Sequence, residues 1–88
     1  MPNPVYARVA VRDNWTCQRC GKQAWDLAHI LPRGRFPELK HEEKNIVCLC
    51  RDCHMSTENV EGRCELIALM RDRHNYSYEE EQYSGYIE

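Results

Sequence analysis

Two Cys-x-x-Cys pairs, Cys17/Cys20 and Cys50/Cys53, are the strongest chemical signal in this chain of 88 residues. Four thiolates complete the tetrahedral coordination of Zn²⁺ and leave no open position, which is the pattern of a structural zinc site and not a catalytic one. Gly21 directly follows the first pair and can supply the positive φ angle of a tight metal-binding turn. Structural zinc contributes an apparent ~10–16 kcal/mol in small peptides, more than the stability expected from so small a core. The sequence therefore predicts a zinc-stapled fold.

Cys48 and Cys64 bring the total to 6 cysteines, a number that also fits three disulfides in a secreted protein. The N-terminal stretch lacks an apolar segment followed by a cleavage site, and no run approaches the ~18 apolar residues of a membrane helix. We therefore expect an intracellular protein without membrane contact, in which paired cysteines hold metal more often than each other. Only Cys50 and Cys53 have knuckle spacing, so we interpret Cys48 and Cys64 as small buried apolar residues.

A closed four-cysteine site leaves His54, which directly follows Cys53, free for other chemistry. His54 is the last residue of an ordered set: Cys-x-x-Cys, then His29, then Asn45, then Cys-x-x-Cys-His. In this order the chain resembles the HNH nucleases, in their zinc-stapled, phage-like variety, over residues 8 to about 58. The resemblance implies a ββα-metal fold and a metal-dependent DNA endonuclease that leaves 5′-phosphate and 3′-hydroxyl ends. It also implies the cytoplasm of a bacterial or phage-infected cell.

The resemblance further implies a role for each member of the set. His29 matches the general base, and an imidazole with an ordinary pKa near ~6.5 can deprotonate a water molecule at neutral pH. Asn45 matches an asparagine that either braces the intervening loop or reaches the catalytic metal. His54 matches a ligand of the single catalytic cation, which acts as a Lewis acid. Taken singly, a strand histidine is more often a packing residue and an asparagine before a strand is more often a turn residue.

One position departs from the family pattern. The residue before the base is usually Asp or His and serves as another metal ligand, whereas here it is Ala28. Glu58 is the best replacement, because its i, i+4 spacing places it on the same helix face as His54. A carboxylate there favours Mg²⁺ or Mn²⁺ over Ni²⁺ or Zn²⁺ as the catalytic ion. Asp26 is a weaker candidate, since it lies three residues before His29 and tends toward the other face of a strand.

Arginines close to these residues are candidates for contact with DNA phosphates. Arg33 and Arg35 lie in the loop after the base, and Arg51 lies between the last two zinc ligands. The net charge of −2 does not favour nucleic acid, but residues 8–51 carry more Lys and Arg than Asp and Glu. A solvated loop is an equally good interpretation of Arg33 and Arg35.

A second hypothesis belongs to another class of function. With the metal ligand lost at Ala28, the chain can instead be a non-catalytic zinc module that binds nucleic acid or a protein partner. Residues 76–88 form an acidic tail that suits a protein-docking segment under either hypothesis, and its tyrosines are Tyr76, Tyr78, Tyr83 and Tyr86.

The elements that must position these residues follow from turn signals and apolar patterns. We expect a helix over residues 3–14, followed by two strands over 24–31 and 45–50 that a loop over 32–44 separates. After the strands we expect two helical turns over 51–59, an interruption at Gly62 and an amphipathic helix over 63–74. The stripe of that last helix is assigned to Cys64, Ile67 and Ala68, with Arg71 as a further candidate and with Leu66, Leu69 and Met70 beside it. Ser77 and Glu80 have capping-box spacing for a final short helix. The predicted architecture is α+β: one domain over 1–75, with two short antiparallel strands and flanking helices, and a tail over 76–88.

Overall fold

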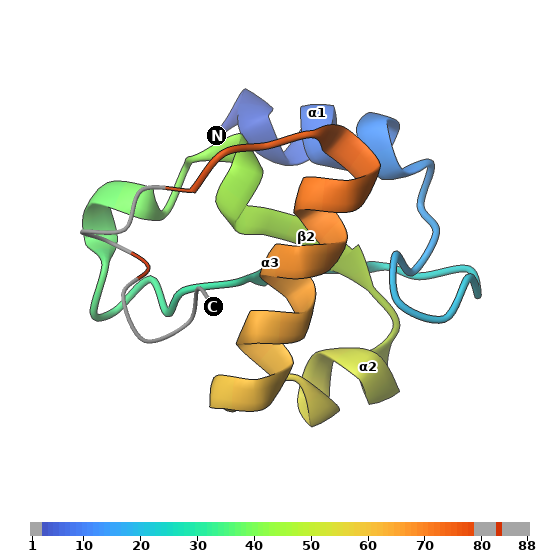
Figure 1. Ribbon diagram of the computed structural model, residues 1–88. Helices are drawn as coiled ribbons and strands as arrows, with labels where there is room; N and C mark the ends of the chain where they lie inside the picture. Colours follow the sequence, from blue (N-terminus) through green and yellow to red (C-terminus); the bar gives the residue numbers. More distant parts are fainter. Residues whose placement is uncertain (1–2, 79–82, 84–88) are drawn as a thin grey trace.

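The structure, a computed structural model, describes residues 3–78 and residue 83. Its elements follow in the order α1 (Pro4–Asp13), β1 (Asp26–His29), the 3-10 turns η1 (Pro37–Leu39) and η2 (Glu43–Asn45), β2 (Ile46–Leu49), α2 (Arg51–Ser56) and α3 (Val60–His74). The strands pair antiparallel, with Asp26 opposite Leu49 and His29 opposite Ile46. Two antiparallel strands flanked by helices (Figure 1) are the predicted small α+β fold, which is confirmed and is consistent with a ββα-metal arrangement.

Helix α1 begins where the sequence predicts. The Asn3 side chain accepts a hydrogen bond of 2.9 Å from the backbone N–H of Val5, and Pro4 occupies the first helical turn. Val5 and Val9 are buried and form a cluster with Ile46 of β2. The apolar face of α1 thus covers one side of the strand pair.

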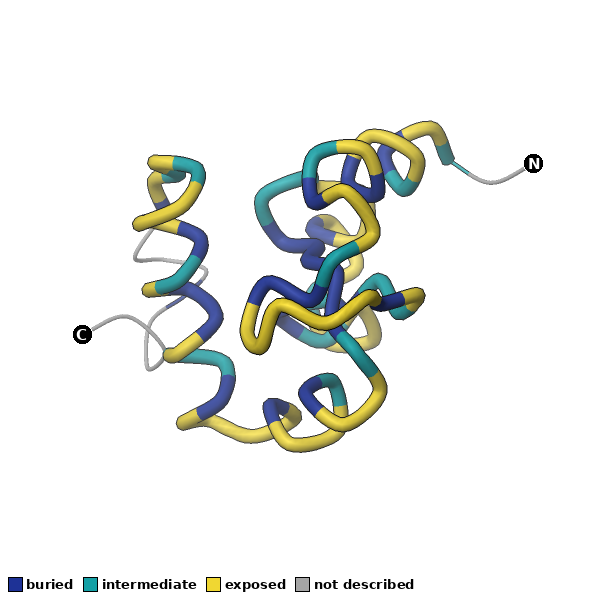
Figure 2. The backbone as a smooth tube through the Cα atoms, turned by 90° about the vertical axis from the view of Figure 1, so that its right-hand side faces the viewer, coloured by how far each residue is buried: buried dark blue, intermediate teal, exposed yellow. Residues whose placement is uncertain are grey.

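Strand β2 is buried along its whole length and forms the centre of the core. Ile46 packs on α1, whereas Val47, Cys48 and Leu49 belong to the cluster that contains Leu66 and Ile67 of α3. Figure 2 shows α1 and α3 on opposite sides of the central strands. The strand pair is therefore enclosed on both faces, which fixes the ends of β1 and β2 that carry the site.

Helix α3 begins earlier than the sequence predicts. The helix starts at Val60, so Gly62 lies inside its first turn and does not interrupt it. A Cβ atom at Gly62 would lie 2.3 Å from the Thr57 Cα atom, so only glycine allows this contact between the turn after α2 and α3. The Asn59 side chain caps the helix by accepting a hydrogen bond of 2.7 Å from Gly62 N–H.

This close contact also fixes the rotation of α3 and corrects the predicted apolar stripe. Leu66, Ile67 and Met70 are the buried large side chains of the helix, whereas Ala68 is exposed and Cys64 only half-buried. Periodicity alone allowed either of two adjacent stripes, and the contact of Gly62 with the Thr57 backbone selects one of them. Cys48 is fully buried, as predicted.

Three predicted boundaries shift by a few residues. β1 begins at Asp26 and not at residue 24, because the Ala24 N–H bonds the Trp15 carbonyl at 2.9 Å. The loop over 32–44 contains the short turns η1 and η2. α2 ends at Ser56, so Glu58 lies in the turn that follows the helix and not within it.

Two tyrosines of the predicted tail pack against the core. Tyr78 and Tyr83 are buried with ring centroids 4.8 Å apart, and the Tyr78 hydroxyl donates to the Lys44 carbonyl at 2.7 Å. The hydroxyl of Tyr76 donates to the Glu43 carboxylate at 3.0 Å. Through these contacts the three tyrosines pack against the core beyond residue 75. Tyr86 and the predicted capping box at Ser77 and Glu80 involve positions outside the described residues. No helix of the described part is long and apolar enough to cross a membrane.

Candidate active site

The four predicted zinc ligands lie together. The sulfur atoms of Cys17, Cys20, Cys50 and Cys53 all lie within 4.8 Å of one another, and those of Cys20 and Cys50 are 3.6 Å apart. Four sulfurs at the usual Zn–S length of ~2.3 Å from one ion would be separated by about 3.8 Å, so the cluster can hold a structural zinc ion. The turn has the expected chemistry, with Gly21 at φ 84°.

Backbone groups prepare one of these thiols for metal. Burial by itself raises the pKa of Cys17, but hydrogen bonds from the backbone of Cys50, Cys20 and Arg19 outweigh it and lower the pKa to about 6. Cys53 behaves oppositely in the metal-free fold: burial raises its pKa to about 12, although a hydrogen bond from Arg19 opposes the shift. The cluster thus holds one thiol that ionises readily and one that ionises only when a cation neutralises it.

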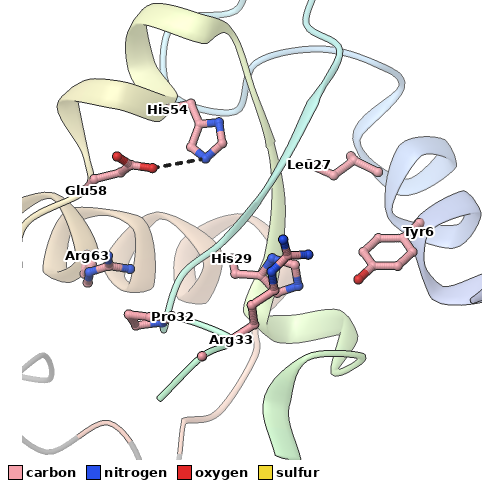
Figure 3. Close-up of a pocket in the computed structure, with 9 residues that line it drawn as sticks. Tyr6, Leu27, His29, Pro32, Arg33, His54, Glu58 and Arg63 are labelled. Atoms are coloured by element: carbon pink, nitrogen blue, oxygen red, sulfur yellow. Dashed lines mark ion pairs between the residues drawn. The ribbon is translucent and has the colours of Figure 1, made fainter. Parts of the chain in front are cut away.

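A second, separate site lies at the end of β1. A pocket of about 460 Å³ contains both His29 and His54, together with Arg33, Glu58 and Arg63 (Figure 3). The remaining lining residues are Tyr6, Leu27, Pro32 and Gly34. Side chains from β1, the following loop, α1, α2 and α3 therefore meet in one cavity.

His29 is held by its backbone surroundings. Its Nε2 atom lies 2.9 Å from the Lys40 carbonyl oxygen, which can only accept, so Nε2 carries the proton and Nδ1 carries the lone pair of the neutral ring. Burial lowers the pKa of His29 below 6.5, the bond to Lys40 opposes this, and the neighbouring Arg33, His41 and His54 lower it further. The imidazole is therefore neutral at neutral pH and can accept a proton.

His54 lies between two carboxylates. Its Nδ1 atom is 3.0 Å from Oδ2 of Asp26, and its Nε2 atom is 3.6 Å from Oε1 of Glu58 (Figure 3). Because an ionised carboxylate only accepts, Nδ1 donates to Asp26, and in the neutral ring the lone pair is then on Nε2, on the Glu58 side. Glu58 lies beside His54 as its spacing predicted, although α2 ends before it.

These two sites have the order and separation of a known family. The HNH endonuclease family model matches residues 17–59, a segment that begins at the first zinc ligand and ends just after Glu58. These residues form an HNH endonuclease domain. Searches of the curated proteins and of the solved structures returned no match. The phage source suggested by the sequence gains no support from these comparisons.

The Asn45 of the HNH set is fully buried. Its Oδ1 atom accepts from the Leu31 N–H at 3.0 Å and from the Tyr83 hydroxyl at 3.1 Å. Its Nδ2 atom donates to the carbonyls of Leu31 and Leu39, both at 3.3 Å. Both amide atoms are engaged inside the protein and Asn45 does not line the pocket, which favours the bracing role over the role as metal ligand.

The position that departs from the HNH pattern faces away from the pocket. Ala28 is buried in the main core cluster, opposite Val47 of β2. The nearest carboxylate on the same strand is that of Asp26, which was expected to tend away from the site but reaches His54 through the Nδ1 contact. The HNH domain therefore surrounds its helical histidine with Asp26 and Glu58 in place of a carboxylate at position 28.

The three arginines predicted to meet DNA differ in their surroundings. Arg33 lines the pocket, whereas Arg35 lies outside the lining with its guanidinium 5.8 Å from the Phe36 ring centre. Arg51 pairs with Asp26 at 3.0 Å, and its side chain is 77% exposed at the start of α2. Of the three, only Arg33 lines the cavity that holds both histidines.

Sequence reasoning missed two pocket residues, and both lie outside the HNH match. Tyr6 of α1 places its ring edge-on to His29 at a centroid distance of 6.2 Å. Arg63 of α3 lines the opposite part of the pocket and donates through Nη1 to the Ile30 carbonyl. Neither has a motif neighbour, so no sequence signal pointed to them; only the packing of α1 and α3 around the strands brings them in.

Proposed function

We propose that this chain is a metal-dependent DNA endonuclease in which His29 is the general base and His54 and Glu58 hold the catalytic cation. Membership of the HNH endonucleases implies nuclease activity. The single observation that carries the residue assignment is the shared pocket, in which both histidines lie with Glu58 and Arg33.

The donor set fits a divalent cation. His54 Nε2 and Glu58 Oε1 are 3.6 Å apart, a separation that two ligands at the usual ~2.1 Å from one ion can have. One imidazole nitrogen and one carboxylate oxygen leave further positions for water and substrate phosphate. This mixed set suits Mg²⁺ or Mn²⁺, and its imidazole also admits Ni²⁺ or Zn²⁺. When bound, such a cation would supply Lewis-acid stabilisation of the charge that develops on the phosphate and on the departing 3′ oxygen.

The protein's own groups account for the proton transfer. With Nε2–H donated to Lys40, the Nδ1 lone pair of His29 takes a proton from the attacking water. Water attacks the phosphorus, the bond to the 3′ oxygen breaks, and the products carry 5′-phosphate and 3′-hydroxyl ends. Asn45 stabilises this arrangement, because three of its hydrogen bonds tie the loop after β1 to the residue before β2 and the fourth comes from the Tyr83 hydroxyl.

DNA contact is proposed for three arginines. Arg33 is the closest candidate to the scissile phosphate because it shares the pocket with His29. Arg35 and Arg51 are exposed on either side and suit phosphates further along the strand. Guanidinium contacts of this kind hold the backbone and carry little sequence information, so we expect low intrinsic sequence specificity.

The second candidate, a non-catalytic zinc module, is favoured by one observation only. Ala28 gives the pocket no ligand of its own, and within the described residues the groups with three or more close metal donors are limited to the four cysteines. Incubation of supercoiled plasmid with the protein and Mg²⁺, Mn²⁺, Ni²⁺ or EDTA separates the two functions. Nicked or linear product that needs an added divalent ion and is lost in His29→Ala supports the nuclease. DNA binding without cleavage under every metal supports the module.

A further inference from the structure

We propose that Arg63 of α3 is a phosphate-binding residue of the pocket, which works with Arg33 to hold the nucleic-acid backbone across the catalytic groups. This inference rests on the proposed nuclease function. Arg63 lies beyond the segment that matches the HNH family, which ends at residue 59. In Figure 3, Arg63 lies on the side of Glu58 and Arg33 lies beside His29, so the two arginines enter the pocket from different parts of its wall.

The fold places Arg63 in the pocket by two constraints. Gly62 lies against the Thr57 backbone, which brings the first turn of α3 next to the turn that carries Glu58. The Arg63 guanidinium then donates through Nη1 to the carbonyl of Ile30, the residue that follows His29. One nitrogen of the guanidinium is thus hydrogen-bonded next to His29, and the remaining N–H donors can bind a ligand.

Charge indicates what that ligand is. Among the residues that the structure describes, Arg8, Arg12, Arg19 and Arg51 each pair with a carboxylate. No carboxylate of residues 3–78 lies within ion-pair distance of Arg33 or Arg63, although both line a cavity that also contains Glu58. Two guanidinium groups that share a cavity, neither of them within ion-pair distance of its Glu58 carboxylate, favour a doubly contacted anion. The planar fork of arginine fits the non-bridging oxygens of a phosphodiester, which is the substrate class of the pocket.

With both arginines, the pocket would contact a longer stretch of the nucleic-acid backbone than the matched HNH segment alone could contact. Arg33 would contact phosphate from the loop after β1, and Arg63 would contact it from the first turn of α3, near Glu58. The strand would therefore be held on both sides of the scissile bond, which restricts its position along the pocket. Contacts of this kind do not distinguish bases, so both arginines contribute to affinity and salt dependence and not to sequence choice.

Binding experiments on matched variants test the proposal. The parent is the full chain with His29→Ala, titrated with a fluorescein-labelled DNA duplex in EDTA-free buffer without divalent ions, at several salt concentrations. Arg63→Gln keeps a side-chain donor for Ile30 but removes the charge. Arg73→Gln is its control, because Arg73 is an exposed arginine in the last turn of the same helix. We expect Arg63→Gln to weaken binding by about tenfold or more and to reduce the slope of log K against log salt by about 0.9, and Arg73→Gln to change neither.

A second measurement avoids substitution of Arg63 altogether. The ¹⁵Nε resonances of Arg63 and Arg73 in the parent are followed during the DNA titration, with melting temperature and zinc content measured for every variant. Arg63 is expected to shift at saturating DNA and Arg73 to stay in place. Equal affinity and slope for the two glutamine variants, or an Arg63 resonance that DNA does not move, would overturn the role of Arg63 while leaving the nuclease assignment intact. Absence of any DNA binding by the parent would overturn both.

Discussion

His54 Nδ1 lies 3.0 Å from the Asp26 carboxylate, and this hydrogen bond fixes the orientation of the imidazole that lines the pocket. Asp26 also accepts from Arg51 at 3.0 Å, which fixes the carboxylate in turn. A carboxylate in this position sets the tautomer of a metal-binding histidine and increases its basicity. Asp26 can therefore contribute to cation binding without lining the pocket.

We predict that Asp26→Ala weakens Mn²⁺ binding by roughly 10- to 100-fold, the usual effect of removing a carboxylate behind a metal-binding histidine. Isothermal titration of the zinc-loaded protein with Mn²⁺ measures the change. Asp52→Ala is the control, because Asp52 is an exposed acid in the first turn of α2 with no recorded bond to His54. Equal Mn²⁺ affinity in the two variants would contradict the role of Asp26.

Loss of the base should affect the chemical step alone. We predict that His29→Ala lowers the cleavage rate by roughly 10²- to 10⁴-fold, the usual contribution of general-base catalysis. DNA affinity and melting temperature should stay close to those of the unaltered chain, since Nε2 makes a single bond to Lys40. Single-turnover cleavage and fluorescence anisotropy provide the two measurements, and an unaltered rate would remove His29 from the mechanism.

The pH dependence of cleavage follows from the surroundings of His29. Burial and the neighbouring positive groups lower its pKa below 6.5, and a general base works only when it is neutral. Cleavage should therefore fall as pH drops through the lowered pKa, so the acid limb of the rate profile lies below pH 6.5 at saturating Mn²⁺. A limb centred above that value would show that another group controls the acid side.

Neighbouring residues at the boundary of the two sites should fail in different ways. Cys53→Ser removes one of four zinc ligands, so we predict loss of zinc and a collapse of thermal stability. His54→Ala should retain zinc and fold but lose cation-dependent cleavage, with partial recovery in excess Mn²⁺. Elemental analysis, melting curves and plasmid cleavage compare the two. If both variants lost zinc equally, His54 would belong to the structural site.

A buried ion pair at the end of α1, which is also hydrogen-bonded to β2, should dominate stability apart from zinc. The Asp13 carboxylate is fully buried, accepts two bonds of 2.8 Å from Arg12 and accepts a third of 2.9 Å from Cys48 N–H. Asp13→Ala leaves the Arg12 charge unpaired, so we predict a loss of about 3–5 kcal/mol in the free energy of unfolding. Arg8→Ala breaks only an exposed pair with Glu43 and should cost about 0–1 kcal/mol by chemical denaturation. Similar losses in the two variants would contradict this assignment.

The sequence predicted best the residues whose function depends on local spacing. The cysteine pairs and His54 were identifiable because ligands three residues apart meet through a single turn, whatever surrounds them. Asn45 was identifiable as a candidate, but the sequence could not distinguish a loop-bracing role from a metal-binding role. That distinction depends on contacts with Tyr83, Leu31 and Leu39, which only the folded chain brings together.

The errors arose where packing between distant segments decides. Gly62 reads as a helix breaker in the sequence, yet it lies inside α3 because Thr57 leaves no room for a side chain. Tyr78 and Tyr83 lie in a polar, acidic segment, yet their rings fill a gap in the core. Arg63 carries no motif, and its position follows from the rotation that Gly62 imposes on α3.

The pocket has a mixed origin, and this limits how far the domain can be reduced or transplanted. Tyr6 and Arg63 enter it from helices that lie outside residues 17–59. A fragment cut to the matched segment would keep the zinc cluster and both histidines but lose two walls of the cavity and the helices that cover β2. Such a fragment, grafted onto another scaffold, would carry the two histidines but not the pocket side chains of Tyr6 and Arg63. The structural unit that forms this pocket is therefore larger than the matched segment, because the flanking helices contribute part of its lining.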